Sequence, residues 1–207
     1  MKREINPSDT SRATAFEMWM SSQQPMVTVF KTIDITRIVK LSHKTDFKFN
    51  MLMCYCIGKA ANRIPEFLVL PEKGKLMKYD KIGINVIVPK AQGGINWCDI
   101  PFDDDINEFK QSYINLTKRA SEEGEYINDF DLMIIGTSNL SEFEFDGVVN
   151  QYNNSWNNPF MAWGKYRSNL FRKYLKLSFQ FHHVQMDGEQ ACRFLQFLQE
   201  EVDRIKI

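Results

Sequence analysis

The 207-residue sequence has no excess charge of either sign and no long apolar run. Lys plus Arg equals Asp plus Glu at 26 each, so no overall field favours nucleic acid or an anionic membrane, and no dense basic run occurs locally. No stretch approaches the roughly 18 apolar residues of a membrane span, and the N-terminal residues turn polar before any apolar run develops. We therefore expect a cytoplasmic protein without a nucleic-acid or membrane partner.

The sequence contains few cysteines and no segment with the composition of a linker. The four cysteines, Cys54, Cys56, Cys98 and Cys192, lack the paired spacing of metal ligands. Cys54 and Cys56 fall in an apolar helical run, which predicts reduced, buried thiols, so we predict no metal site. No repeat, low-complexity tract or Pro/Gly/Ser linker interrupts the chain. With 43% hydrophobic residues it is long enough for one core and too short for two ordinary enzyme domains, which predicts a single domain over residues 1–207.

Helical and strand periodicities follow one another without a regular βαβ rhythm. Helices are expected over residues 12–20 after a start at 8–10, from residue 34 onward, and over 50–64, 103–120 and 188–204. Strands are expected over residues 25–32, 82–88, 132–137, 143–149, 160–163 and 170–181, with 67–70 and 76–79 flanking a hairpin turn. This mixture predicts an α+β two-layer sandwich, in which helices pack on one face of a mixed, mostly antiparallel sheet.

The stretch from His182 to Gly188 places a base and a carboxylate four residues apart where a strand gives way to a helix. Consecutive residues of a strand point to opposite faces, so only one of the two imidazoles can face a given cleft. A neutral imidazole, with an ordinary pKa of about 6.5, can take a proton from an attacking hydroxyl or thiol. Asp187 could orient a histidine directly or pair with a cation. A merely packed and hydrogen-bonded His-His pair is the alternative, but Asp and Gly at this spacing favour an acyltransferase.

Several further stretches extend this pattern along the chain. They are Arg12 four residues before Phe16-Glu17, Lys31-Thr32-Ile33-Asp34-Ile35-Thr36, Lys48-Phe49, and Asn158-Pro159 with Gly164-Lys165-Tyr166. With these residues the chain resembles the chloramphenicol acetyltransferases nearly end to end. The resemblance implies the fold of that family, acetyl-CoA as co-substrate, and transfer of the acetyl group to a hydroxyl of chloramphenicol, which inactivates the antibiotic. It also implies a homotrimer with active sites at subunit interfaces.

Catalytic roles follow from the same resemblance. His183 matches the general base, which removes a proton from the acceptor hydroxyl as it attacks the thioester, without an acyl-enzyme. Asp187 and Arg12 match a carboxylate and an arginine that pair with each other and hold the strand end. Thr137, in Gly136-Thr137-Ser138-Asn139, falls where the family has a serine whose hydroxyl stabilises the oxyanion.

Binding roles also come from the resemblance. Lys48, Lys165 and Tyr166 match positions that line the outer part of the coenzyme A tunnel. Trp19, Pro25 and Val27 match acceptor-pocket positions on the side that faces the base across the subunit interface.

Three departures from the family pattern concern the acceptor pocket and the oxyanion. Leu140-Ser141 replaces a Pro-Trp pair, and the segment after it is about two residues shorter. Ala162 replaces a threonine that holds an oxyanion water in the family. Residues 92–98 do not follow the family's Thr/Phe-rich pattern beside the acceptor. Reaction type is therefore better supported than acceptor identity.

Other readings of the histidine motif stay open. Dihydrolipoamide acyltransferases and condensation domains of peptide synthetases share it, but their usual lengths and modules do not fit this chain. An acetyltransferase of the same fold with another hydroxyl acceptor, or a catalytically silent homologue that binds a small molecule, also fits the fold. A Ser-His-Asp hydrolase is disfavoured because no Gly-x-Ser-x-Gly elbow is present.

Overall fold

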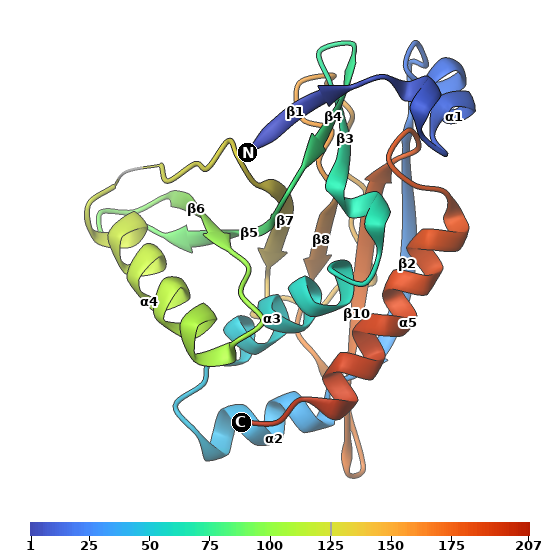
Figure 1. The fold of residues 1–207 in the computed structure, drawn as a ribbon. Coiled ribbons are helices and arrows are strands. Elements are labelled where there is room, and N and C mark those ends of the chain that lie inside the picture. Colours follow the sequence, from blue (N-terminus) through green and yellow to red (C-terminus); the bar gives the residue numbers. More distant parts are fainter. Residues whose placement is uncertain (125) are drawn as a thin grey trace.

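In the part of the chain that the structure describes, five α-helices surround a mixed sheet and a smaller antiparallel sheet (Figure 1). The structure is a computed structural model that describes residues 1–124 and 126–207. The helices are α1 Ala13–Trp19, α2 Thr36–Lys44, α3 Phe49–Ala61, α4 Ile106–Glu122 and α5 Gly188–Arg204, with short 3-10 turns at Pro7–Asp9 and Pro65–Leu68. No helix in this described part is long and apolar enough to cross a membrane.

The large sheet has the strand order β2-β10-β8-β7-β5-β6, and β9 pairs with β10 outside this path. Its strands are β2 Met26–Asp34, β5 Ile82–Pro89, β6 Ile95–Pro101, β7 Met133–Asn139, β8 Phe160–Trp163, β9 Arg167–Asn169 and β10 Arg172–His182. β7 pairs in parallel with β5 and β8, and the other pairings are antiparallel. The predicted α+β layered fold with a mixed, mostly antiparallel sheet is confirmed.

The smaller sheet joins β1 Lys2–Ile5 to the hairpin of β3 Val69–Glu72 and β4 Lys75–Tyr79. The hairpin turn consists of Lys73 and Gly74, which both adopt positive φ angles, at 48° and 81°. Two residues with left-handed backbone are what a tight hairpin loop of this kind requires. The predicted hairpin is therefore present, shifted by one or two residues.

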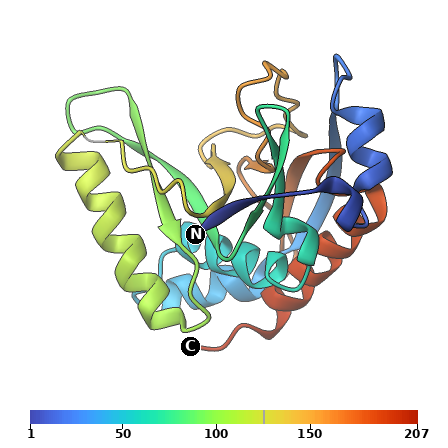
Figure 2. The ribbon, with the colours of Figure 1, turned by 45° about the horizontal axis from the view of Figure 1, so that its top comes forward.

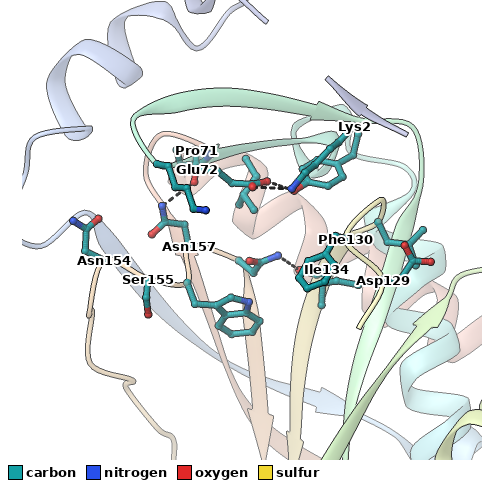
Figure 3. A pocket seen from close by; sticks show the side chains of 15 residues that line it. Lys2, Pro71, Glu72, Asp129, Phe130, Ile134, Asn154, Ser155 and Asn157 are labelled. Atoms are coloured by element: carbon teal, nitrogen blue, oxygen red, sulfur yellow. Dashed lines mark hydrogen bonds and ion pairs between the residues drawn. The ribbon is translucent and has the colours of Figure 1, made fainter. Parts of the chain in front are cut away.

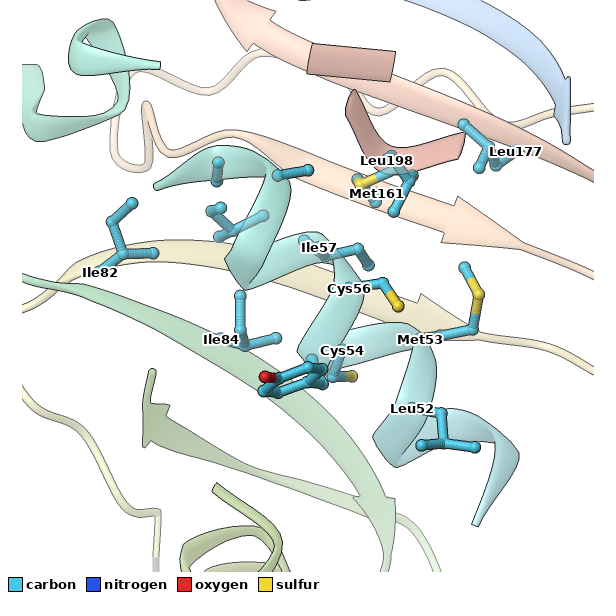
Figure 4. Close-up of a cluster of buried hydrophobic side chains, with 14 of the residues drawn as sticks. Leu52, Met53, Cys54, Cys56, Ile57, Ile82, Ile84, Met161, Leu177 and Leu198 are labelled. Atoms are coloured by element: carbon cyan, nitrogen blue, oxygen red, sulfur yellow. The ribbon is translucent and has the colours of Figure 1, made fainter. Parts of the chain in front are cut away.

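One face of the large sheet, which we call the inner face, packs against the helices. α3 lies across it and directs Leu52, Cys54 and Ile57 among side chains of β5, β8, β10 and α5 (Figure 4). This explains why its sequence is apolar all round rather than amphipathic: neighbours surround the helix on nearly every side. In Figure 2, α4 and α5 flank the molecule, while the loop near residue 150 lies on the side away from α2 and α3.

The opposite face, which we call the outer face, is partly covered by residues 143–152. Alternate residues of β10 hold this segment: the Ser178 hydroxyl lies 3.4 Å from the Val148 N–H, the Gln180 amide donates to the Asn150 carbonyl at 2.9 Å, and the His182 ring meets the Tyr152 ring. The predicted strand over 143–149 is wrong. The segment lies across the sheet face instead of beside a strand edge, so its backbone forms no ladder.

The sequence also missed β1, β6 and β9. Residues 95–101 contain Asn, Asp and Pro, which are depleted in strands, yet β6 pairs with β5 over seven residues. Of the predicted strand over 170–181, residues 172–181 belong to β10, and Leu170 and Phe171 form the turn that joins β9 to β10. In β6, tertiary pairing overrides local preference.

Candidate functional site

Arg12 ties the start of the chain to the turn after β10. Its guanidinium donates to the carbonyls of His183 at 2.7 Å and Val184 at 2.9 Å, and to both carboxylate oxygens of Asp187 at 2.6 and 2.9 Å. The Arg12 side chain is only 6% exposed. A planar fork of donors suits this task, because one group has to satisfy two carbonyls and a carboxylate at once.

Asp187 closes the other side of this turn. It is the N-cap of α5, where its side chain accepts from the backbone of Gln190 and the Gln190 side chain accepts from the Asp187 N–H. The hydrogen bond from Arg12 holds the pKa of the Asp187 carboxyl below its usual value, against the smaller opposing effect of burial. The carboxylate is therefore anionic near neutral pH and fixed by both Arg12 and the helix end.

His183 lies between this carboxylate and an aromatic ring. Its Nδ1 is 3.1 Å from an Asp187 oxygen, within ion-pair range but not aligned for a hydrogen bond. Its ring stacks on the indole of Trp19, with centroids 4.4 Å apart and planes 4° apart. The backbone N–H of His183 donates to the carbonyl of Pro25 at 2.9 Å. The imidazole is thus held from both sides, while its side chain keeps 26% exposure.

His182 points to the outer face and is fully buried. Its Nδ1 accepts the N–H of Val184 at 3.1 Å, which fixes the proton on Nε2. Burial, and next the neighbouring His183, lower the pKa of His182 to about 4. As predicted for consecutive residues at a strand end, the two histidines occupy different environments.

Trp19, Pro25 and Val27 surround the same strand end. Val27 pairs with Phe181 across β2 and β10, next to the contacts that Trp19 and Pro25 make with His183. Within one chain, Trp19 and Pro25 therefore lie beside His183. The placement of these residues opposite the base of another subunit stays a prediction.

Thr137 lies elsewhere, in the middle of β7. Its side chain is on the inner face, 1% of the residue is exposed, and its hydroxyl donates to the carbonyl of Asn85 at 2.7 Å. Thr137 is level with Met161 and, through it, with Phe179 of β10. Thr137 lies two strand spacings across the sheet from β10 and four residues along that strand from His183. The distance between the two residues is therefore roughly 16 Å.

The residues predicted for coenzyme A form a third group. Lys48 precedes Phe49 at the start of α3, and the Phe49 ring lies 6.0 Å from the ring of Tyr166, which follows Lys165. Tyr166 also lines a cavity of about 260 Å³ whose other lining residues include Lys40, His43, Lys44, Phe171 and Lys173. Lys165 lies two residues beyond Trp163, which pairs with Leu177 of β10. The group therefore lies roughly 26 Å from His183, measured along the strands.

A larger cavity, of about 430 Å³, opens between the small sheet and the loops before β7 and β8 (Figure 3). The amide of Asn157 donates to the Pro71 carbonyl at 2.8 Å, and Lys2 pairs with Glu72 at 3.0 Å. None of the predicted site residues lines it.

Comparison with known proteins identifies the family of the chain. A model of the family described as chloramphenicol acetyltransferase matches residues 3–199. The chain belongs to the chloramphenicol acetyltransferase family. It is thus a member of an acyltransferase family, as the sequence predicted.

Individual members of this family share about a quarter of their residues with the chain. Chloramphenicol acetyltransferase 2 of Escherichia coli is 28% identical over 184 residues, which is 84% of each protein. A solved chloramphenicol acetyltransferase superposes with a TM-score of 0.85 at 20% identity, covering 98% of this chain and 100% of that one. A probable dihydrolipoamide acetyltransferase from Listeria monocytogenes follows at a TM-score of 0.71 and 14% identity, covering 99% and 94%. At these identities the structural likenesses support the fold alone.

Proposed function

We propose that this member of the chloramphenicol acetyltransferase family transfers the acetyl group of acetyl-CoA to a hydroxyl of chloramphenicol, with His183 as the general base. One observation carries the proposal: a partly exposed imidazole is clamped by Trp19, Asp187 and Arg12 at the end of β10. These contacts fix the orientation of the imidazole and leave one of its edges available, which is the arrangement expected of a general base.

The reaction needs one proton to move twice. With Nδ1 beside the anionic Asp187, the proton of neutral His183 is favoured on Nδ1, so Nε2 is the acceptor. Nε2 takes the proton of the acceptor hydroxyl while its oxygen attacks the thioester carbonyl. The tetrahedral intermediate expels the coenzyme A thiolate, which takes the same proton back from the imidazolium. The products are the acetyl ester and free coenzyme A, and no group on the protein is acylated.

Asp187 contributes a fixed negative charge that stabilises the imidazolium in the transition state. Arg12 keeps the Asp187 carboxylate from moving closer to the His183 ring, because its guanidinium holds both carboxylate oxygens. We therefore propose that the Arg12–Asp187 pair fixes the turn that carries His183 and supplies the negative charge beside its ring.

Lys48, Lys165 and Tyr166 are the proposed contacts of coenzyme A. The cavity beside Tyr166 offers two aromatic rings, and Lys40, Lys44 and Lys173 line it without any carboxylate. Aromatic faces and ammonium groups fit an adenine ring and phosphates, respectively. The acceptor is proposed to lie against Trp19, Pro25 and Val27, at the opposite end of the sheet.

A homotrimer with shared active sites is part of the proposal. Within one chain the base and the proposed coenzyme A contacts lie roughly 26 Å apart along the strands. A second copy that docks on the outer face could bring its His183 to the first copy's coenzyme A side. Partly exposed apolar side chains on and over this face, at Phe30, Phe143 and Val149, support such docking.

The first test measures release of coenzyme A thiol from acetyl-CoA, with and without chloramphenicol. We expect chloramphenicol-dependent release that disappears in His183→Ala and persists in Arg193→Ala, a control at an exposed ion pair on α5. A folded His183→Ala protein with full activity would contradict the role of the base. Release with another hydroxyl acceptor but not with chloramphenicol would retain the reaction and replace the acceptor, and no release with any acceptor would favour a silent homologue.

A further inference from the structure

The side chain of Gln185 is fully buried in the turn that carries His183. The backbone N–H of Gln185 donates to the His182 carbonyl at 2.9 Å. His183 and Val184 are therefore the central residues of a tight turn over residues 182–185, which we call the His183 turn. The Gln185 side chain donates from Nε2 to the carbonyl of Val69 at 2.8 Å. Its amide thus links the His183 turn to β3 of the small sheet.

A second side-chain amide binds the same edge of β3. This strand is the outer strand of the small sheet, with β4 on its other side. Two residues after Val69, the carbonyl of Pro71 accepts a hydrogen bond from the amide of Asn157 at 2.8 Å (Figure 3). Alternate carbonyls of one strand edge are therefore held by Gln185 from the His183 turn and by Asn157 from the loop before β8, which lies outside the proposed site.

Both amides also bury an oxygen. In the part of the chain that the structure describes, Gln185 Oε1 and Asn157 Oδ1 are buried and meet no hydrogen-bond donor. A buried acceptor without a partner costs at least as much free energy as a neutral amide hydrogen bond contributes. The net contribution of Gln185 to stability is therefore small. Unlike an apolar side chain of equal size, however, its amide fixes the position of the His183 turn relative to β3.

The His183 turn is held at two places along its length. Arg12 holds the carbonyls of His183 and Val184 at its centre, and Gln185 holds its last residue against β3. A turn that is fixed only at its centre can still pivot about the end of β10. A general base has to lie within about 0.5 Å and 10–20° of its productive geometry, so this second point of attachment matters for catalysis.

We propose that Gln185 is a positioning residue for His183, and that its hydrogen bond to the Val69 carbonyl sets the orientation of the imidazole. The inference rests on the proposed acetyl transfer and adds a residue that acts through the backbone of the turn. Loss of this hydrogen bond lowers kcat at nearly unchanged KM, because the substrate contacts stay in place while the base moves. A misplacement of about 1 Å costs as much as 10²-fold in rate.

Two matched variants of the full-length protein separate the turn from the small sheet. Gln185→Met keeps the length of the side chain without the donor, and Asn157→Leu removes the corresponding donor from the loop before β8. Gln185→Met is expected to lower kcat by about 10–100-fold, with KM for both substrates within a few-fold of wild type, whereas Asn157→Leu keeps kcat. Each variant loses one hydrogen bond and one unpaired oxygen, so both should keep nearly the Tm of wild type.

Gln185→Glu tests whether the donor itself is required. A carboxylate has no proton to donate to the Val69 carbonyl, but a protonated carboxyl group donates through its O–H. Burial raises the pKa of such a carboxyl group, so the kcat of this variant relative to wild type should rise as pH falls from about 8.5 to about 5.5. A folded Gln185→Glu protein whose relative kcat stays as low as that of Gln185→Met at every pH would overturn the proposal.

The His183 ring supplies a readout that does not depend on activity. The sequence has three histidines, and comparison with His183→Ala assigns the His183 ring signals in the NMR spectrum of the wild type. Because this ring stacks on the Trp19 indole, the indole shifts the signals of its protons. Gln185→Met should reduce this shift or broaden the signals, and Asn157→Leu should leave them unchanged.

The outcomes separate this inference from the proposed function. Wild-type kcat and unchanged His183 signals in Gln185→Met, or an equal loss of kcat in Asn157→Leu, would overturn the positioning role while acetyl transfer stands. A wild type without acetyl transfer to any acceptor would overturn the proposed function, and the His183 signals of the two variants would then decide alone whether Gln185 positions the ring.

Discussion

Replacing Arg12 tests how the turn around His183 is held together. In Arg12→Ala, the carbonyls of His183 and Val184 lose charged donors in a place where the arginine itself is only 6% exposed. Hydrogen bonds from charged groups contribute about 1.5–3 kcal/mol each. The contribution of Asp187 is smaller, because this carboxylate is 46% exposed and solvent screens it. We therefore expect Arg12→Ala to lower the free energy of unfolding by about 3–5 kcal/mol.

Arg12→Lys separates charge from geometry. Lysine retains the positive charge but cannot reach two carbonyls and a carboxylate with one ammonium. It should recover about half of the lost stability and little of the activity, because the turn that carries His183 is no longer fixed.

Denaturant unfolding followed by fluorescence measures both variants, at one fixed protomer concentration because oligomers gain stability by mass action. Arg193→Ala is the control, since its partner Glu189 is exposed, and it should change stability by less than about 0.5 kcal/mol. An Arg12→Ala protein that loses less than about 1 kcal/mol, or an Arg12→Lys protein equal to wild type in stability and kcat, would refute this account of the turn.

Two further predictions concern acid and packing. Because the pKa of His182 is lowered from 6.5 to about 4, this residue binds more protons in the unfolded chain than in the folded one between these pH values. The free energy of unfolding should therefore fall as pH falls from 6.5 to about 4. His182→Gln should flatten this part of the profile in urea titrations, and an unchanged slope would contradict the prediction. Gly136→Ala should lower Tm, because its Cβ would overlap Trp156 and Phe160 at a cost of about 1–3 kcal/mol, whereas Gly188→Ala, with open space around it, should leave Tm unchanged or slightly higher in calorimetry.

The sequence predicted the helices better than the strands. The apolar run of α3 and the amphipathic pattern of α5 are local signals, and both helices formed where they were expected. β6 could not be predicted, because its polar residues are compatible with a strand only once β5 lies beside them. The segment 143–149 shows the reverse case: it alternates like a strand, but side chains of β10 hold it across the sheet face.

The candidate site was predictable in composition and less so in geometry. His183, Asp187 and Arg12 meet as the resemblance implied, although 171 residues separate Arg12 from His183. Motif matching could not show that the Thr137 side chain is buried, because this depends on the face of β7 that the residue occupies. Period-two alternation was the signal that could have decided it: Met133 and Ile135 are core residues and place Thr137 on the inner face with them.

The separation of His183 from the proposed coenzyme A contacts within one chain has a genetic consequence. If each active site combines the histidine of one subunit with the coenzyme A contacts of its neighbour, two inactive alleles can complement each other. When His183→Ala chains and chains inactivated at the coenzyme A contacts assemble at random into trimers from equal amounts, about a quarter of all interfaces would hold an intact site. A cell that carries both alleles would then regain activity that neither allele supplies alone, and one inactive allele beside a normal one would lower activity without abolishing it.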